Sequence, residues 1–235
     1  MASPFGPAVL LAYRAAALAT VVCVGAAQLA TRGPACLAFY TVWSWWLLGA
    51  FFAVAGAASL LAVVVRGPSP PRRSAALAPL GAAAVALFHV ALPSSLIVVV
   101  VTWVVLFPML VNSPEAKVAT RAREIFLNPT SYAQHGGNAL LALGDLALNT
   151  IPASPYLMAG LGAYSSTFAV WAFAFWRATG RWLYPFLNAH KRWAPAAYAG
   201  LYIAHWVFFG VAMLLFKARD RAVAALGGGG KGKEA

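Results

Sequence analysis

Hydrophobic residues run in long blocks that are separated by short polar segments. Six apolar stretches are each about 20 residues or longer, which is the length an α-helix needs to cross a bilayer. They lie at about 8–30, 36–65, 75–111, 131–152, 156–176 and 195–216. The pattern therefore predicts an all-α, polytopic membrane bundle of six transmembrane helices, forming a single domain over residues 1–217.

Two of these stretches depart from the simple pattern. The stretch at 75–111 is long enough for two short spans broken at Pro93, or for one long helix kinked at that proline. We expect the single kinked helix. The stretch at 131–152 is the least apolar, and its polar residues are His135, Asn138, Asp145 and Asn149.

The composition supports a membrane protein. Hydrophobic residues make up 62% of the chain and charged residues only 9%, which excludes an ordinary soluble domain and a disordered one. The net charge is +12, but no basic segment is interleaved with aromatics, so we expect no nucleic-acid partner. Cys23 and Cys36 form neither a disulfide framework nor a metal motif, and we expect no cofactor or metal.

The C-terminal segment differs from the rest of the chain. Residues 218–235 are basic and Gly-rich, which predicts a flexible tail. Its last five residues, KGKEA, resemble a dilysine retrieval signal of the endoplasmic reticulum; the alternative is a solvated tail with two lysines. We expect a multi-pass protein of the endoplasmic reticulum or another endomembrane, with the plasma membrane left open.

Polar side chains on the fourth predicted span fall on one face. At about 100° per residue, with His135 at zero, Asn138 lies near −60°, Asp145 near −80°, and both Ser131 and Asn149 near −40°. Ionisable residues within spans are costly and tend to mark function. This face therefore points into the bundle or a watery cavity. Its alternative role is to join helices by hydrogen bonds.

Two other predicted spans carry smaller polar faces. Thr41 and Ser44 lie about 60° apart near the start of the second span, although a threonine there commonly bonds the carbonyl one turn before it. On the sixth span, Tyr198, Tyr202 and His205 share a face about 60° wide. A buried, hydrogen-bonded histidine is the alternative interpretation of His205.

The chemistry that these residues allow is limited. No GxSxG, HExxH, P-loop, GxGxxG or CxxC motif is present. A hydroxyl and an imidazole are the minimum for nucleophilic acyl transfer. With six spans, Thr41 lies roughly 7–8 Å below the face at which the span of His135 begins. Trp182 and Tyr184, in the fifth loop, lie at that same face.

Three motifs resemble the androgen-induced and androgen-regulated family of multi-span hydrolases, which cleave fatty acid esters of hydroxy fatty acids. The most specific is TGRWLYPFL at 179–187, close to the family's Gly-x-Trp-x-Tyr-Pro-Phe-Leu. The others are QHGGN at 134–138, where the family has a His-Gly pair, and FYT at 39–41, where it has a threonine. Order, spacing and span count agree over roughly residues 8–216.

The resemblance implies that Thr41 is the nucleophile and His135 its general base. The chain departs from the family pattern at Asn138, where the family has a second histidine. Asp145 also lies about one turn nearer to His135 than the family's acid does. At ten residues, roughly 15 Å along a helix, it is too far for a direct bond to His135.

The sequence therefore leads to the hypothesis of a membrane-embedded threonine hydrolase whose lipid ester substrate enters from the bilayer. We expect the supporting or pocket-lining residues to be Ser44, Asn138, Asp145, Trp182, Tyr184 and His205. The alternative function is a non-enzymatic transporter or binding protein that uses the polar face of the fourth span. Haem-based electron transfer through paired histidines is a third possibility.

Overall fold

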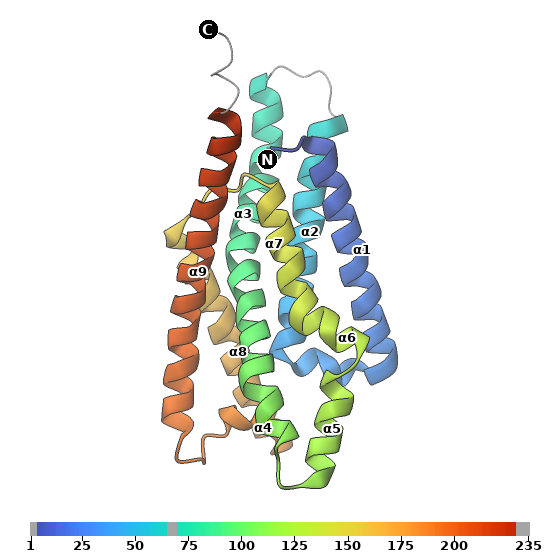
Figure 1. Cartoon of the computed structure of the whole chain (residues 1–235), viewed down its shortest axis with the longest axis vertical. Coiled ribbons are helices and arrows are strands. Elements are labelled where there is room, and N and C mark those ends of the chain that lie inside the picture. The colour runs from blue at the N-terminus through green and yellow to red at the C-terminus, as the bar shows by residue number, and fades with distance from the viewer. Residues whose placement is uncertain (1–3, 65–69, 229–235) are drawn as a thin grey trace.

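The computed structural model describes residues 4–64 and 70–228, and within these ranges its regular secondary structure is entirely helical (Figure 1). The α-helices are α1 (Pro7–Arg32), α2 (Tyr40–Val64), α3 (Pro70–Val100), α4 (Phe107–Val111), α5 (Ala116–Phe126), α6 (Pro129–Tyr132), α7 (Asn138–Leu148), α8 (Met158–Thr179) and α9 (Ala194–Gly228). The 3₁₀ turns are η1 (Pro34–Ala38), η4 (Pro155–Leu157) and η5 (Pro185–Leu187), and the π-helical turns are η2 (Val101–Leu106) and η3 (Ala133–Gly137). The prediction of an all-α bundle is confirmed.

Within the described residues, five helices are long and apolar enough to cross a membrane. They are Pro7–Arg32, Tyr40–Val64, Ala78–Val111, Pro155–Thr179 and Ala194–Leu226. These helices support a multi-pass membrane protein. They correspond to five of the six predicted spans.

The fourth predicted span differs from the others. Residues 131–152 do not form one long helix but lie within α6, the π turn η3 and α7, and the chain is extended after Leu148. With 11 residues, α7 is only about 16 Å long, short of the roughly 30 Å hydrocarbon core. The expected count of six spanning helices is therefore five in the structure. The polar residues and paired glycines of this segment account for its broken helix.

The third predicted span is a single element, as expected, but its irregularity is not at Pro93. α-Helical geometry continues through Pro93, and the α-helix gives way to the π turn η2 only at Val101. Pro108 follows at the start of α4. Because a proline lacks an N–H and its ring collides with the carbonyl four residues earlier, a wider π turn before it is a natural accommodation.

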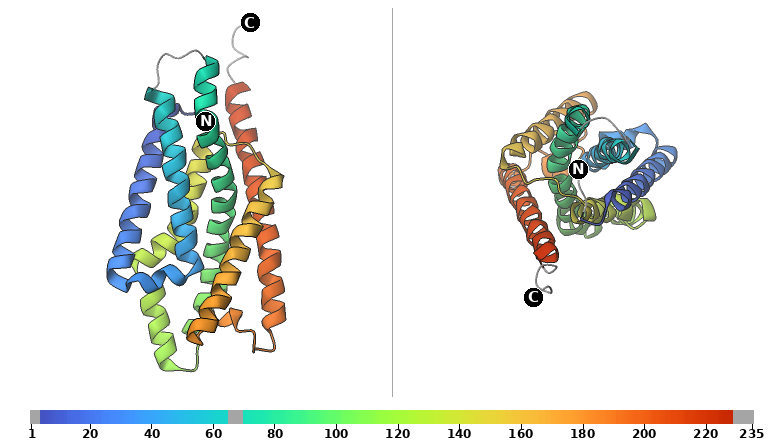
Figure 2. Two further views of the ribbon diagram at one scale, coloured as in Figure 1. Left: turned by 180° about the vertical axis from the view of Figure 1, so that it is seen from behind. Right: turned by 90° about the horizontal axis from the view of Figure 1, so that it is seen from above.

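The helix α3 lies at the centre of the bundle and contacts α2, α7, α8 and α9 (Figure 2). The main core lies among α1, α2, α3, α7 and α9 and includes Trp45, Phe51, Phe88 and Phe216, all fully buried. A second apolar cluster includes Phe126, Phe168 and Phe186 and lies at the opposite end of the bundle from the two termini. This second cluster surrounds the candidate site.

The C-terminal helix is longer than the sequence predicts. The expected flexible tail began at residue 218, but α9 continues to Gly228. Arg219 helps to hold this extension, because its Nη1 donates to the Asn149 side chain at 2.8 Å and its Nη2 to the Ile151 carbonyl at 2.6 Å. Residues 229–235, including the KGKEA signal, lie outside the described residues.

Candidate functional site

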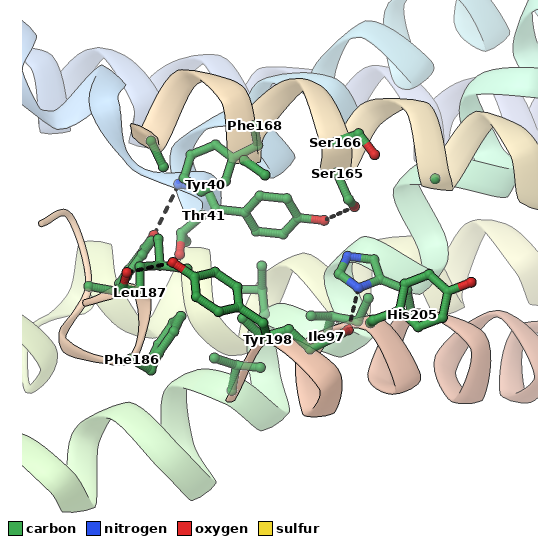
Figure 3. Close-up of a pocket in the computed structure, with 18 of the residues that line it drawn as sticks. Tyr40, Thr41, Ile97, Ser165, Ser166, Phe168, Phe186, Leu187, Tyr198 and His205 are labelled. Atoms are coloured by element: carbon green, nitrogen blue, oxygen red, sulfur yellow. Dashed lines mark hydrogen bonds between the residues drawn. The ribbon is translucent and has the colours of Figure 1, made fainter. Parts of the chain in front are cut away.

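An elongated cavity of about 580 Å³ lies between α3, α8 and α9 (Figure 3). Its lining is mostly apolar and extends along α8 from Met158 to Phe173, about 22 Å of helix. The start of α2 and the segment around η5 close one end. Ligand cavities are commonly 300–1,000 Å³ and largely apolar, with a few polar groups that orient the ligand. The shape and lining suit a flexible hydrocarbon chain.

One side of the cavity reaches the outer surface of the bundle. Phe173 on α8, and Tyr202 and Trp206 on α9, line the cavity, yet they are 54%, 65% and 52% exposed. These positions belong to two of the five candidate membrane spans. An opening between α8 and α9 would therefore face lipid rather than water.

Thr41 lies at the closed end of this cavity. It is the second residue of α2, it is 9% exposed and it contributes to the cavity wall. Its side chain hydrogen-bonds to Tyr184, whose hydroxyl also accepts the backbone N–H of Tyr40 at 3.0 Å. The hydroxyl predicted to be the nucleophile thus borders an apolar chamber and has a phenol beside it.

Tyr184 is held in place by the aromatic residues around it. The chain is extended at Tyr184, and Pro185 then begins η5. Its ring packs edge-on against Phe39, with centroids 5.7 Å apart, and stacks on Phe186 at 5.1 Å. Burial raises the pKa of Tyr184 to about 12, although its hydrogen bonds to Thr41 and Tyr40 act in the opposite direction. The residue therefore remains a protonated phenol, able to donate a hydrogen bond, at any physiological pH.

Further polar groups lie along the cavity from Thr41. The hydroxyl of Tyr40 lies 3.3 Å from Ser165 Oγ on α8 and 3.4 Å from Ser94 Oγ on α3. Tyr198 lines the cavity and donates to the Leu187 carbonyl at 2.6 Å. Tyr40 and Ser165 were not predicted from the sequence, because single hydroxyls on apolar helices carry no spacing signal.

Three of the predicted supporting residues line the cavity, namely Trp182, Tyr184 and His205. Trp182 stacks on Trp176 with ring centroids 4.7 Å apart and an interplanar angle of 11°. His205 lies further along α9, and Nδ1 of its ring is 2.6 Å from the Leu201 carbonyl. Ser44, in contrast, is not part of the wall; it is buried, and its hydroxyl lies 3.3 Å from Tyr164 Oη.

His135 lies on the π turn η3, which contacts both α2 and α3. Its Nδ1 is 2.8 Å from the Ser131 carbonyl and 2.9 Å from Ser131 Oγ. Because a carbonyl can only accept, Nδ1 carries the proton, and Nε2 of the neutral ring keeps its lone pair. Phe126 and Trp103 pack against the ring, at centroid distances of 5.6 and 6.5 Å.

The structure does not join His135 directly to Thr41. His135 is not among the residues that line the cavity, and the described residues include no hydrogen bond between the two side chains. The π turn explains part of the difference from the sequence analysis. Widening one turn of a helix rotates the residues before it relative to those after it, so a constant 100° step does not hold across His135.

The other polar residues of the fourth predicted span point inward, as expected, but they form hydrogen bonds with other protein groups. Ser131, Asn138, Asp145 and Asn149 are all at most 2% exposed. Asn138 Nδ2 lies 3.5 Å from the Ser95 carbonyl, and its Oδ1 accepts the backbone N–H of Ala139. Neither Asn138 nor Asp145 lines the cavity.

Asp145 pairs with Arg14 on α1, a residue that was not selected from the sequence. Arg14 Nε donates to Asp145 Oδ1 at 2.7 Å and Arg14 Nη2 to Oδ2 at 3.1 Å, with both side chains fully buried. Arg14 also donates to Ser59 Oγ at 2.7 Å, and Asn149 donates to Asp145 Oδ2. Arg14 and Asp145 are opposite charges within apolar segments, which is the signal that could have identified the pair.

Two further groups of polar side chains also form internal hydrogen bonds. His89 Nδ1 is 2.8 Å from the Val85 carbonyl, and its Nε2 accepts the Ser154 N–H at 3.0 Å, so both ring nitrogens are occupied. Gln28 and Gln134 exchange two side-chain hydrogen bonds, at 2.7 and 2.9 Å. Across the described residues, no group of three or more His, Cys, Asp or Glu could hold a metal ion.

No protein-family model, curated protein or solved structure matches this chain. The resemblance carried by residues 39–41, 134–138 and 179–187 accordingly stays a prediction. Two of the three motifs contribute to the cavity wall, through Thr41 and through Trp182, Tyr184, Phe186 and Leu187.

Proposed function

We propose that the protein is a membrane-embedded hydrolase of lipid esters and that Thr41 is its nucleophile. The observation that carries this proposal is the position of Thr41. Its side chain borders a long apolar cavity and hydrogen-bonds to the buried phenol of Tyr184. A hydrocarbon chain in the cavity would bring a carbonyl at its end to this hydroxyl.

His135 is the proposed general base. The bond from Nδ1 to the Ser131 carbonyl fixes the tautomer in which Nε2 accepts a proton, and hydrogen bonds of this kind orient catalytic histidines. The π turn that carries His135 contacts α2, the helix of Thr41. Hydrogen bonds between nucleophile and base are often long in ligand-free enzymes and shorten when substrate binds.

The proposed reaction has two halves. Thr41 Oγ1 attacks the ester carbonyl while its proton passes to His135, and Tyr184 donates a hydrogen bond to the oxyanion. The carbon–oxygen ester bond breaks, and the leaving alkoxide takes the proton from His135 to become an alcohol. Water then attacks the acyl-threonine with His135 again as base, which releases a carboxylic acid and restores Thr41.

The proposed substrates are fatty acid esters of hydroxy fatty acids or related lipid esters, the class that the sequence resemblance implies. The exposed lining residues Phe173, Tyr202 and Trp206 support entry from the bilayer between α8 and α9. The proposed location is the endoplasmic reticulum or another endomembrane, supported by the KGKEA sequence, with the plasma membrane as the alternative. Asp145 and Asn149 are bonded to Arg14 and Arg219, so no observation favours a transport path along the fourth span.

The test is hydrolysis of a hydroxy-fatty-acid ester by purified protein in nanodiscs, with a simple lipid ester as a second substrate. We expect Thr41→Ala and His135→Ala each to lower kcat/KM at least a hundredfold, the scale for a nucleophile or its base. Thr41→Ser should retain measurable turnover, because it keeps a hydroxyl. Mass spectrometry of acid-quenched enzyme should detect an acyl group on Thr41.

Matched controls are Thr167→Ala and His190→Ala, since both residues are exposed and outside the cavity wall. Both variants should hydrolyse the ester at the wild-type rate. Full activity in Thr41→Ala would refute the nucleophile. Lipid binding by folded wild-type protein without any hydrolysis would instead indicate a lipid-binding protein.

A further inference from the structure

One buried polar atom in the cavity wall has no partner. Within the described residues, the buried side-chain nitrogen and oxygen atoms without a hydrogen bond are Ser95 Oγ and His205 Nε2. Of these two residues, only His205 lines the cavity. Buried polar atoms in proteins are almost always hydrogen-bonded, so an unpaired one beside a cavity is available to a polar group that the cavity admits, either a ligand group or a water.

The hydrogen bonding of the ring determines what kind of group would fit. His205 Nδ1 is 2.6 Å from the Leu201 carbonyl, which can only accept, so the proton of the neutral ring is on Nδ1. The lone pair of Nε2 is then unused, on a residue that lines the cavity. Its natural partner is a hydrogen-bond donor on the ligand, and among the groups of simple lipids that donor is an O–H.

The positions of Thr41 and His205 show how far apart these two polar groups lie along the cavity. Figure 3 shows Thr41 and Tyr198 towards the end of the cavity where Phe186 and Leu187 lie, while the His205 ring lies further along α9. The step from Tyr198 to His205 is two helical turns, or about 10 Å of rise. Thr41 and His205 therefore lie at separate levels of one elongated cavity.

We propose that His205 Nε2 binds the O–H group of a lipid, either a hydroxyl or an un-ionised carboxyl, whose chain occupies the cavity. The inference deepens the proposed function, on which it rests for the lipid class. It assigns a second polar anchor about two helical turns from the reactive ester. His205 is a specificity-determining residue in this scheme and takes no part in bond breaking.

The test is equilibrium binding of three radiolabelled C16 probes to Thr41→Ala protein in nanodiscs. The probes are 1-hexadecanol, palmitic acid and methyl palmitate, which share a chain but differ in the O–H group. We expect at least one of the first two to bind about tenfold more tightly than the methyl ester, the value of one hydrogen bond. Preference for the alcohol would identify a hydroxyl ligand, and preference for the acid, strongest at low pH, a carboxyl ligand.

The variants separate the anchor from general effects on the cavity. His205→Phe, which removes the acceptor, should abolish the preference and leave methyl palmitate affinity within about twofold. His205→Gln should retain part of the preference, because its amide oxygen can accept. His190→Phe, which changes an exposed histidine outside the cavity, should behave like the parent protein.

Equal affinity of the three probes, no binding of any probe, or an undiminished preference in His205→Phe would each overturn the proposal. If His205→Phe fails to fold, the relative affinities of the three probes for the Thr41→Ala protein decide whether the proposal holds. Because binding is measured in a protein without the Thr41 hydroxyl, the anchor can be confirmed even where wild-type protein hydrolyses no ester. Conversely, hydrolysis without any O–H preference would leave the proposed function intact and refute the anchor.

Discussion

The two ends of the bundle differ in what surrounds their buried polar residues. Between α1 and α7, Arg14 and Asp145 are fully buried and form a closed network with Ser59 and Asn149. Towards the other end, Thr41 faces an open apolar cavity, and His205 Nε2, further along that cavity, has no partner. Burial alone does not distinguish these two sets of residues. The difference teaches that contact with a cavity, rather than burial, separates residues that are available to a ligand from those that hold helices together.

The largest effect is expected from a substitution that disrupts the closed network of Arg14 and Asp145. Arg14→Leu would leave the Asp145 carboxylate buried without its cation, which costs about 3–5 kcal/mol in proteins. We expect a large fall in thermal stability, measured by unfolding in detergent. The double variant Arg14→Leu/Asp145→Leu should recover much of the loss, because no uncompensated charge remains.

The exposed pair of Arg121 and Glu124 provides the control. Its side chains are 71% and 56% exposed, so Arg121→Ala should change stability by less than about 1 kcal/mol. A stability loss for Arg14→Leu no larger than that of the control would contradict the structural role of the network.

Close packing beside this network gives the second prediction. A Cβ at Gly144 would overlap the hydroxyl of Tyr13, which donates to the Leu141 carbonyl at 2.7 Å. Gly144→Ala should therefore destabilise the protein by about 1–3 kcal/mol, the usual cost of overpacking. Thermal unfolding checks this, and combining it with Tyr13→Phe should relieve part of the clash. Wild-type stability in Gly144→Ala would show that the helices move apart freely.

At the cavity end, Tyr184→Phe should affect activity more than stability. It removes the phenol that bonds Thr41 and the Tyr40 N–H, and we expect about a tenfold loss of kcat/KM, the value of one hydrogen bond in the transition state. Unchanged lipid-ester turnover in the folded variant would remove Tyr184 from the proposed site.

The pH dependence of stability offers a separate measurement on Tyr184. Because its pKa is raised from about 10 to about 12, the folded protein holds this proton more tightly than the unfolded chain. Its contribution to stability is therefore complete below pH 10 and lost as the pH rises towards 12. Tyr184→Phe should have a shallower decline than wild type over that range, and an identical decline would contradict the assignment.

The smallest expected effect comes from Gly162, which lines the cavity and would meet no atom within 4 Å if given a Cβ. Gly162→Ala should leave thermal stability within about 0.5 kcal/mol, the usual range away from packed features. The added methyl would narrow the cavity, so we expect a change of a few fold in KM for a long-chain ester. The same substitution at Gly144 provides the contrast. Equal stability losses at the two positions would contradict the conclusion that Gly144 is tightly packed and Gly162 is not.

Much of the fold followed from the sequence pattern. Five predicted spans are long helices, and the inward face formed by Ser131, Asn138, Asp145 and Asn149 is buried. The fourth span was mispredicted as one long helix, because a window of hydropathy does not detect a π turn or the extended chain after Leu148. The segment from residue 218 was predicted to be a flexible tail because of its charge. Its start is instead held to the bundle, because Arg219 donates hydrogen bonds to buried acceptors on Asn149 and Ile151.

The candidate site was predictable only in part. Thr41, Trp182, Tyr184 and His205 were selected from polarity, helical angle and motif resemblance, and all four line one cavity. Tyr40 and Ser165 were missed, because their significance comes from facing each other across α2 and α8. Nor could helical angles show that Asp145 is committed to Arg14, 131 residues away in the chain.

By itself, the sequence determined that this is a helical membrane protein and that Ser131, Asn138, Asp145 and Asn149 turn inward. Both properties are local, since they depend on apolar length and on the 3.6-residue period of the backbone. The tertiary structure decided which inward groups satisfy each other, as Arg14 and Asp145 do, and which face a cavity, as Thr41 and His205 do. Pairing between distant segments depends on how whole helices pack, and no local periodicity encodes it.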